Sequence, residues 1–178
     1  MPVTQRYSNF SIALHWLIAV LIVIAFIFGN IMVDMKFSPT KLQYYSYHKW
    51  LGVTILGFVA IRLISRLLSK APPYPANMGK AQQLAANGTH ILLYVLMFAV
   101  PLSGYFYTLA AGYPVVYLGL FELPVLMGPN PEIKETLKEL HEILNKVMFV
   151  LVLLHVAAAL KHHFYDKDGL LNRMRPGR

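Results

Sequence analysis

The sequence contains no cysteine and few charged residues. Without cysteine, a disulfide, a thiolate zinc site, an iron–sulfur cluster and covalent attachment of c-type haem are all excluded. Of the 178 residues, 13% are charged and 57% are apolar, whereas soluble domains average about 25% charged and about 45–50% apolar. A net charge of +8 would suit nucleic acid or a membrane surface. The apolar content favours the membrane, so we expect lipid contacts and no nucleic-acid partner.

Four apolar stretches are each long enough to cross a bilayer, which takes about 20 residues of helix. They cover about residues 11–33, 48–68, 89–111 and 141–163. Pro101 falls inside the third, where neighbouring helices can satisfy the carbonyl that it frees. The connecting segment 112–131 contains several prolines and glycines and is expected to lie along the membrane surface. The sequence therefore predicts an all-α integral membrane protein, with residues 1–178 forming a single domain that is a four-transmembrane-helix bundle.

Positive charge is concentrated on one predicted side of the membrane. The side with both termini and the 71–80 loop carries ten Lys or Arg residues and two Asp residues. The opposite side carries six Lys residues and six acidic residues, so its net charge is zero. Lys and Arg accumulate in cytoplasmic loops of membrane proteins. We therefore expect both termini to be cytoplasmic.

Four of the seven histidines form two pairs at matched depths. His15 and His155 lie near the predicted inner ends of the first and fourth spans, whereas His48 and His141 lie near the outer ends of the second and fourth. His141 and His155 are 14 residues apart, which places them on nearly one helical face and about 21 Å apart. The remaining histidines are His90, His162 and His163.

Two histidines from facing helices can hold a flat cofactor between them. We predict two haem b groups, the inner one held by His15 and His155 and the outer one held by His48 and His141. With both axial positions filled, each iron would favour electron transfer over oxygen binding.

Three further residues fit this arrangement. Gly29 lies on the face of His15 at the outer depth and would let the outer porphyrin approach closely. Arg62 lies on the face of His48 at the inner depth, where its guanidinium would suit a haem propionate; membrane anchoring is the alternative role for Arg62. His162, which follows His155 on the same face, is a candidate proton donor near the inner haem.

Alternative roles of the histidines are also compatible with the sequence. Each can make a hydrogen bond between helices, worth about 1 kcal/mol, and this is the expected role of His90. Zinc usually requires four ligands around one ion, whereas the sequence supplies two at each depth. A proton-linked carrier would need buried acidic partners, and no Asp or Glu lies deep in a predicted span.

The chain resembles the bacterial cytochrome b561 family of four-helix, di-haem membrane proteins over nearly its whole length. Each short motif is common, but their order and spacing are specific to the family. The matching motifs are Tyr7-Ser8 with Ile12 and His15-Trp16-Leu17, His48 with Gly52, Arg62 with Arg66, Pro101-Leu102-Ser103-Gly104, the run from His155 to Phe164, and Lys167-Asp168 with Leu170-Leu171 and Arg173-Met174.

The resemblance implies His15, His48, His141 and His155 as haem ligands and a multi-pass protein of the bacterial inner (cytoplasmic) membrane. The family includes a superoxide oxidase that oxidises periplasmic superoxide and reduces ubiquinone. This chain is therefore expected to be a superoxide:quinone oxidoreductase, with superoxide and ubiquinone as its small-molecule substrates. Four lysines on the outer side could attract superoxide by their local field. They are Lys41, Lys49, Lys134 and Lys138.

Two alternative functions are compatible with the same residues. Related di-haem cytochromes are membrane subunits that exchange electrons between quinone and a partner dehydrogenase or hydrogenase, and such a role would require an electron-transfer partner protein. The second alternative is a non-redox proton-linked carrier or a structural four-helix protein. A homo-oligomer is compatible with each of these functions.

Overall fold

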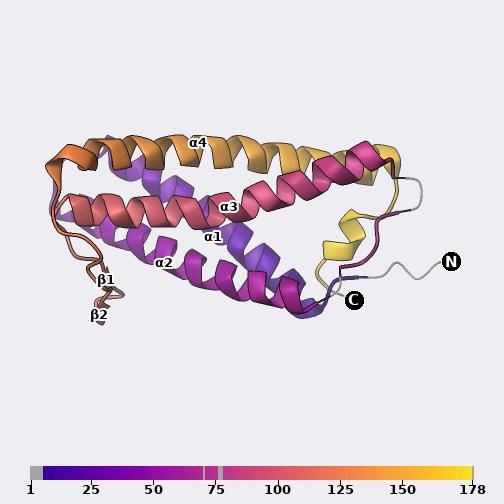
Figure 1. Ribbon diagram of the computed structural model, residues 1–178, viewed down its shortest axis with the longest axis horizontal. Helices are drawn as coiled ribbons and strands as arrows, with labels where there is room; N and C mark the ends of the chain where they lie inside the picture. Colours follow the sequence, from indigo (N-terminus) through magenta and orange to yellow (C-terminus); the bar gives the residue numbers. More distant parts are fainter. Residues whose placement is uncertain (1–5, 70, 76–77, 178) are drawn as a thin grey trace.

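A computed structural model describes residues 6–69, 71–75 and 78–177. Four long helices run antiparallel along a common axis: α1 (Asn9–Asp34), α2 (Pro39–Leu68), α3 (Lys80–Ala110) and α4 (Pro131–Lys161) (Figure 1). In the bundle, α1 packs on α2, α2 on α3, and α3 on α4. The predicted all-α membrane bundle is thus confirmed.

The helix starts follow from local sequence. Ser8, Ser38 and Asn130 are N-caps whose side chains accept hydrogen bonds from backbone N–H groups of the first turn. Pro39 and Pro131 occupy the first helical position, where a missing N–H costs nothing. These caps explain why α2 and α4 begin before their apolar runs.

Three helices are longer than the apolar stretches predicted. Helices α2, α3 and α4 begin at residues 39, 80 and 131, whereas the sequence prediction placed their starts at about 48, 89 and 141. A 31-residue helix is about 46 Å long, but the hydrocarbon core of a bilayer is about 30 Å thick. The extra turns are polar helix that extends beyond the apolar layer.

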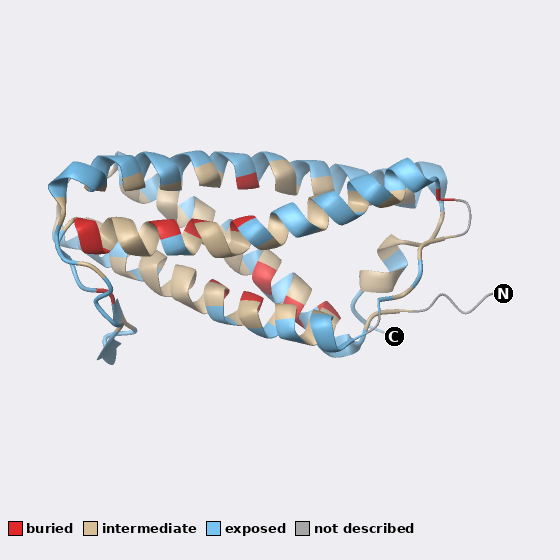
Figure 2. Ribbon diagram, in the orientation of Figure 1, coloured by how far each residue is buried: buried red, intermediate tan, exposed pale blue. Residues whose placement is uncertain are grey.

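The apolar residues lie mainly on the outside of the bundle. All four helices are apolar and long enough to cross a membrane, yet 17% or less of each span is buried inside the protein. Figure 2 shows exposed residues along the outer faces and a few buried residues between the helices. Six of the buried residues form two small clusters, Ile18–Ile55–Val59 and Leu96–Val100–Met148. An apolar exterior of this extent requires lipid around it.

Both described chain ends lie at one end of the bundle, which we call the basic end because Arg62, Arg66 and the basic tail are there (Figure 1). Its charge predicts that it faces the cytoplasm; Lys70 and Arg178, which contributed to that prediction, lie outside the described residues. After α4, a π-helical turn (His162–Asp166) and a 3-10 helix (Leu171–Met174) return the tail to α1. There the indole N–H of Trp16 donates to the carbonyl of Met174 at 2.7 Å.

The opposite end, which we call the hairpin end, carries a short β-hairpin in place of the irregular loop expected for residues 112–131. Strand β1 (Val116–Tyr117) pairs antiparallel with β2 (Phe121–Glu122), with Val116 opposite Glu122 and Tyr117 opposite Phe121. The hairpin lies beside α2 (Figure 1).

Candidate functional site

The imidazole rings of His48 on α2 and His141 on α4 face one another near the hairpin end. Their centroids are 6.2 Å apart and their planes are nearly perpendicular, at 86°. Two imidazoles on opposite sides of one metal ion would have centroids about 6 Å apart, since each metal–nitrogen bond is about 2 Å and each nitrogen lies about 1 Å from its ring centre. The spacing of this pair therefore fits axial ligation of one iron atom.

Hydrogen bonds at Nδ1 leave the other ring nitrogen of each histidine available. His48 Nδ1 lies 3.0 Å from the carbonyl oxygen of Ala25. His141 Nδ1 lies 3.0 Å from the carbonyl oxygen of Val100 and 3.0 Å from Ser103 Oγ. A carbonyl oxygen can only accept, so Nδ1 donates in both rings and Nε2 carries the free lone pair. Such outer-shell bonds set the tautomer and the orientation of metal-ligating histidines.

A glycine makes room for each of these two rings. Gly29 comes four residues after Ala25, and a Cβ atom there would lie 3.3 Å from Cε1 of His48. Gly104 comes four residues after Val100, and a Cβ atom there would lie 2.9 Å from Cε1 of His141. We call each combination of an accepting carbonyl and a glycine four residues later an imidazole seat. Helix α1 forms the seat for α2, and α3 forms the seat for α4.

Most of this arrangement was not predicted from the sequence. Gly29 was predicted to face the porphyrin, and the structure places it against the His48 ring itself. Gly104 was noted only as part of a motif. The only signal in the sequence was a repeated spacing, in which a small or branched apolar residue is followed by a glycine four positions later. This spacing does not identify a seat until the histidine of the opposite helix is placed beside it.

An apolar cavity of about 50 Å³ opens beside the His48–His141 pair, with Phe26, Gly52, Ile55, Met97 and Met148 among its lining. The cavity is much smaller than a porphyrin. The fit of this site to haem therefore rests on the ligand atoms, their spacing and the apolar surroundings, and not on the volume.

Three imidazoles gather nearer the basic end. His15 on α1 and His155 on α4 have centroids 6.2 Å apart, with planes at 75°. His90 on α3 lies 5.6 Å from His155. The His15–His155 spacing repeats that of the other pair, whereas the His90–His155 spacing is shorter. His15 and His155 therefore fit a shared iron atom better, and His90, which was expected to make a hydrogen bond between helices, lies against them as a third ring.

Two arginines lie on α2 beside this group. Arg62 Nη1 donates to the carbonyl of Ser11 at 2.6 Å, four residues before His15 on α1. Arg66 Nη1 donates to the hydroxyl of Tyr7 at 2.9 Å. A guanidinium has five N–H donors, so Arg62 retains donors for a carboxylate group such as a haem propionate.

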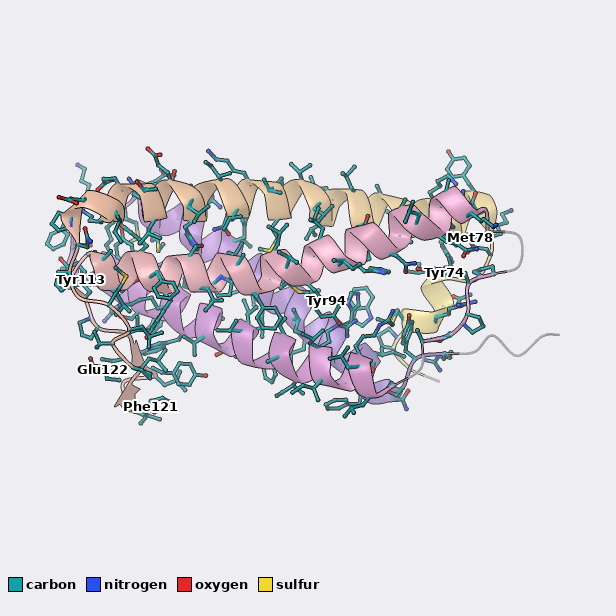
Figure 3. All side chains as sticks on the ribbon, viewed as in Figure 1. Tyr74, Met78, Tyr94, Tyr113, Phe121 and Glu122 are labelled. Atoms are coloured by element: carbon teal, nitrogen blue, oxygen red, sulfur yellow. The ribbon has the colours of Figure 1, made fainter. Side chains whose placement is uncertain are left out.

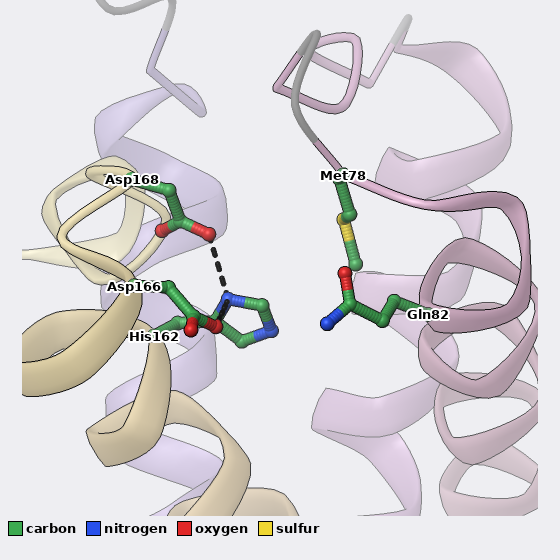
Figure 4. Close-up of a pocket in the computed structure, with 5 residues that line it drawn as sticks. All are labelled: Met78, Gln82, His162, Asp166 and Asp168. Atoms are coloured by element: carbon green, nitrogen blue, oxygen red, sulfur yellow. Dashed lines mark hydrogen bonds and ion pairs between the residues drawn. The ribbon is translucent and has the colours of Figure 1, made fainter.

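His162 directly follows α4 and begins the π-helical turn, beyond the three rings. Its Nδ1 is 2.6 Å from Asp168 Oδ2 and 3.0 Å from Asp166 Oδ2, and Lys161 pairs with Asp166 at 2.7 Å. The imidazole borders a polar cavity of about 270 Å³, and Gln82 and Met78 form its opposite wall (Figure 4). Asp166 and Asp168 were not predicted as site residues. Asp166 reaches His162 within the π-helical turn, at a spacing of four residues, whereas Asp168 reaches it only after the chain reverses at Lys167.

Comparison with known proteins identifies the family of the chain. Residues 6–177 match the family model described as prokaryotic cytochrome b561. Cytochrome b561 homolog 2 of Escherichia coli K12 is 33% identical over 171 residues, covering 96% of this chain and 91% of the relative. Cytochrome b561 homolog 1 of the same organism is 33% identical over 98% of this chain and 99% of its own length. A protein named probable superoxide oxidase CybB from Yersinia pestis is 28% identical over 97% of both chains. The chain thus belongs to the prokaryotic cytochrome b561 family, bacterial multi-pass membrane proteins that use b-type haem in electron transfer.

Proposed function

We propose that this chain is a di-haem oxidoreductase that takes electrons from superoxide at the hairpin end and delivers them to ubiquinone at the basic end. The observation that carries the proposal is the presence of two histidine pairs, each with ring centroids 6.2 Å apart. Along α4 their members His141 and His155 are 14 residues apart, or about 21 Å. Haem with two imidazole ligands supplies one-electron transfer, which suits a one-electron donor.

The reaction balances with two superoxide ions for each quinone. Two superoxide ions lose one electron each and become two oxygen molecules, while ubiquinone gains two electrons and two protons and becomes ubiquinol. The donor end needs no proton, whereas the acceptor end needs two. The proposal therefore requires a proton-transferring group at the basic end.

His162 is the residue that we assign to this proton transfer. Asp166 and Asp168 hold its Nδ1, and the ring borders the cavity opposite Gln82 (Figure 4). When the ring is protonated on both nitrogens, Nε2–H can donate a proton to a quinone oxygen. The carboxylates of Asp166 and Asp168, which accept from Nδ1–H, hold the ring in place during that transfer.

At the hairpin end, the four predicted lysines do not have equal surroundings. Lys41 Nζ donates to the carbonyl of Met35 at 2.7 Å, and Lys134 pairs with Glu135 at 3.2 Å. Lys49 directly follows the ligand candidate His48 in α2. Lys138 comes three residues before the ligand candidate His141 in α4. We therefore assign Lys49 and Lys138, rather than Lys41 or Lys134, as the main local attraction for a superoxide anion. The name of the Yersinia pestis relative supports superoxide as the donor.

The test begins with the haem content of the purified chain, measured as pyridine haemochrome, and we expect two b-type haems per chain. Superoxide produced by xanthine oxidase should then reduce a soluble ubiquinone analogue in a reaction that superoxide dismutase abolishes. One haem per chain would refute the di-haem arrangement. Two haems that superoxide leaves oxidised would refute superoxide as the donor and favour a partner dehydrogenase.

His162→Gln and His163→Gln form a matched pair for the role of His162. Both residues lie in the same turn after α4, but His163 is exposed and stacks edge-on with Phe164. His162→Gln should keep both haems and their reduction by superoxide, but it should slow quinol formation at least tenfold. This limit is set below the effect of about 100- to 10,000-fold that a well-positioned general acid contributes. His163→Gln should leave all three unchanged. Equal quinol formation by the two variants would remove the proposed role.

A further inference from the structure

The hairpin between α3 and α4 ends in an apolar, solvent-exposed tip. Leu118, Leu120 and Phe121 are 48%, 78% and 54% exposed, and Val125 and Leu126 just after β2 are exposed as well. No charged residue occurs between Tyr113 and Phe121. In water, such a tip would expose a continuous apolar patch with no protein partner among the described residues.

The turn at this tip has a residue that is unusual for its backbone conformation. Leu118 and Gly119 both have positive φ angles, +52° and +73°, and the N–H of Leu120 donates to the carbonyl of Tyr117 at 2.9 Å. Asn-Gly, Asp-Gly or Gly-Gly is the usual pair for two central residues with positive φ, and a bulky residue there is rare. A leucine at this position places an apolar side chain at the tip in spite of the local strain.

The base of the hairpin is fixed to the helices. The indole N–H of Trp50 on α2 donates to the carbonyl of Val116 at 2.7 Å, and Thr54 Oγ1 lies 2.9 Å from the hydroxyl of Tyr117. On α3, the hydroxyl of Tyr105 donates to the carbonyl of Pro124. These contacts determine where the tip points, so its exposure does not result from a loosely attached loop.

The hairpin projects sideways from the bundle and does not cover its end. Figure 1 shows it alongside α2, and Figure 3 shows Phe121 and Glu122 on the side away from the helices. Trp50 is 11 residues into α2, about 16 Å along the helix from its start. The first turns of α2, residues 39–47, are polar, and its apolar run begins at about residue 48. The attachment at Trp50 therefore lies near the level at which the helix enters lipid, where Trp and Tyr residues gather.

We propose that the tip from Leu118 to Phe121 inserts into the lipid leaflet at the hairpin end. The hairpin lies beside α2, and apolar side chains are exposed on both; the exposed apolar surface of the helices itself requires lipid. Lipid contact also explains why the turn carries leucine where a water-exposed turn carries asparagine. The inference depends on the membrane bundle and is independent of the haem ligands and of the electron donor.

The absence of cysteine makes a direct test simple, because one introduced cysteine can carry a nitroxide spin label. Three single variants of the full-length, haem-loaded protein in phosphatidylcholine vesicles provide the comparison. Leu120→Cys reports on the tip, Val150→Cys on an exposed apolar position in the middle of α4, and Glu135→Cys on the polar first turns of α4. All three side chains are exposed, so labelling removes no buried contact, and an unchanged haem spectrum checks the fold.

Power-saturation EPR then compares collisions of each label with oxygen, which concentrates in lipid, and with a water-soluble nickel chelate. The label at position 120 should have an oxygen-to-nickel accessibility ratio at least threefold above the ratio at position 135. The ratio at position 150, in the middle of the membrane span, should also be above that at 135. A ratio equal to that at 135 would show that the tip is in water and overturn the proposal. If neither reagent reaches the label at position 120, the proposal is also overturned, because the tip would then be covered by protein and not by lipid.

Discussion

Replacing Gly104 by alanine tests the imidazole seats most directly, because the structure predicts a graded series for three glycines. The Cβ atom of an alanine would lie 2.9 Å from Cε1 of His141 at position 104 and 3.3 Å from Cε1 of His48 at position 29, but within 4 Å of no other group at the exposed position 57 on α2. Non-bonded carbon atoms prefer separations of about 3.5–4.0 Å. Gly104→Ala therefore produces a clash, Gly29→Ala a tight contact and Gly57→Ala no contact.

The clash at position 104 has no easy relief. The His141 ring is held by the carbonyl of Val100 and the hydroxyl of Ser103, and Ser103 is itself buried. Overpacking of this kind costs about 1–3 kcal/mol. If the ring moves to escape it, the ligand nitrogen moves with it, so the affinity for the haem at the hairpin end should fall about 5- to 150-fold. The accompanying gain of about 1 kcal/mol in helix propensity is present with and without haem and does not restore the affinity.

The assay is the haem content of purified protein together with the free energy of unfolding in detergent. Gly104→Ala should retain close to one haem per chain, Gly29→Ala between one and two, and Gly57→Ala two. Gly57→Ala should also be slightly more stable, by up to about 1 kcal/mol, from helix propensity alone. Full haem content in Gly104→Ala, or a loss in Gly57→Ala as large as that in Gly104→Ala, would refute the role of the seats.

Four further substitutions test the ligand assignments at the two ends. His141→Ala should remove the haem at the hairpin end and leave the other, as measured by haem content and a reduced-minus-oxidised spectrum; loss of only the haem at the basic end would contradict the pairing. His15→Ala should lose the haem at the basic end, whereas His90→Ala should keep it; the reverse pattern of haem content would make His90 the ligand. Ser103→Ala removes one of the two hydrogen-bond acceptors at His141 Nδ1. It should raise the reduction potential of the haem at the hairpin end without loss of haem, because a less basic imidazole stabilises the oxidised iron less. An unchanged or lowered potential in a redox titration would show that the hydroxyl does not tune the ligand.

The sequence predicted the fold and the depth of the histidines because both depend on patterns within single helices. Apolar runs identify spans, and charge asymmetry sets the direction of each span, so residues can be placed at one depth before any packing is known. The extents of the helices were less well predicted. Residues 131–140 are too polar to resemble a membrane span, although Asn130 and Pro131 form a good helix start.

Relations between helices were beyond the sequence. Depth alone placed His90 at the inner end of its helix but could not reveal that it faces His155, because the rotation of α3 depends on packing. The seat residues Ala25 and Val100 have no polar side chain, and their carbonyls matter only once a histidine from another helix points at them. Asp168 reaches His162 only because Lys167 adopts a left-handed conformation, with φ +50°, and reverses the chain.

The arrangement of the seats has a consequence for how the two sites depend on one another. Helix α4 contributes His141 to one pair and His155 to the other, so its register determines both. A slip of one residue would turn each histidine by about 100° and shift it by about 1.5 Å, which would break both pairs together. The seat on α3 opposes such a slip, because Gly104 admits the His141 ring at one position only. The seat on α1 instead holds α2, which contributes a ligand to the hairpin end alone. The seat at Gly104 therefore fixes the alignment of both histidine pairs, whereas the seat at Gly29 fixes that of one pair only.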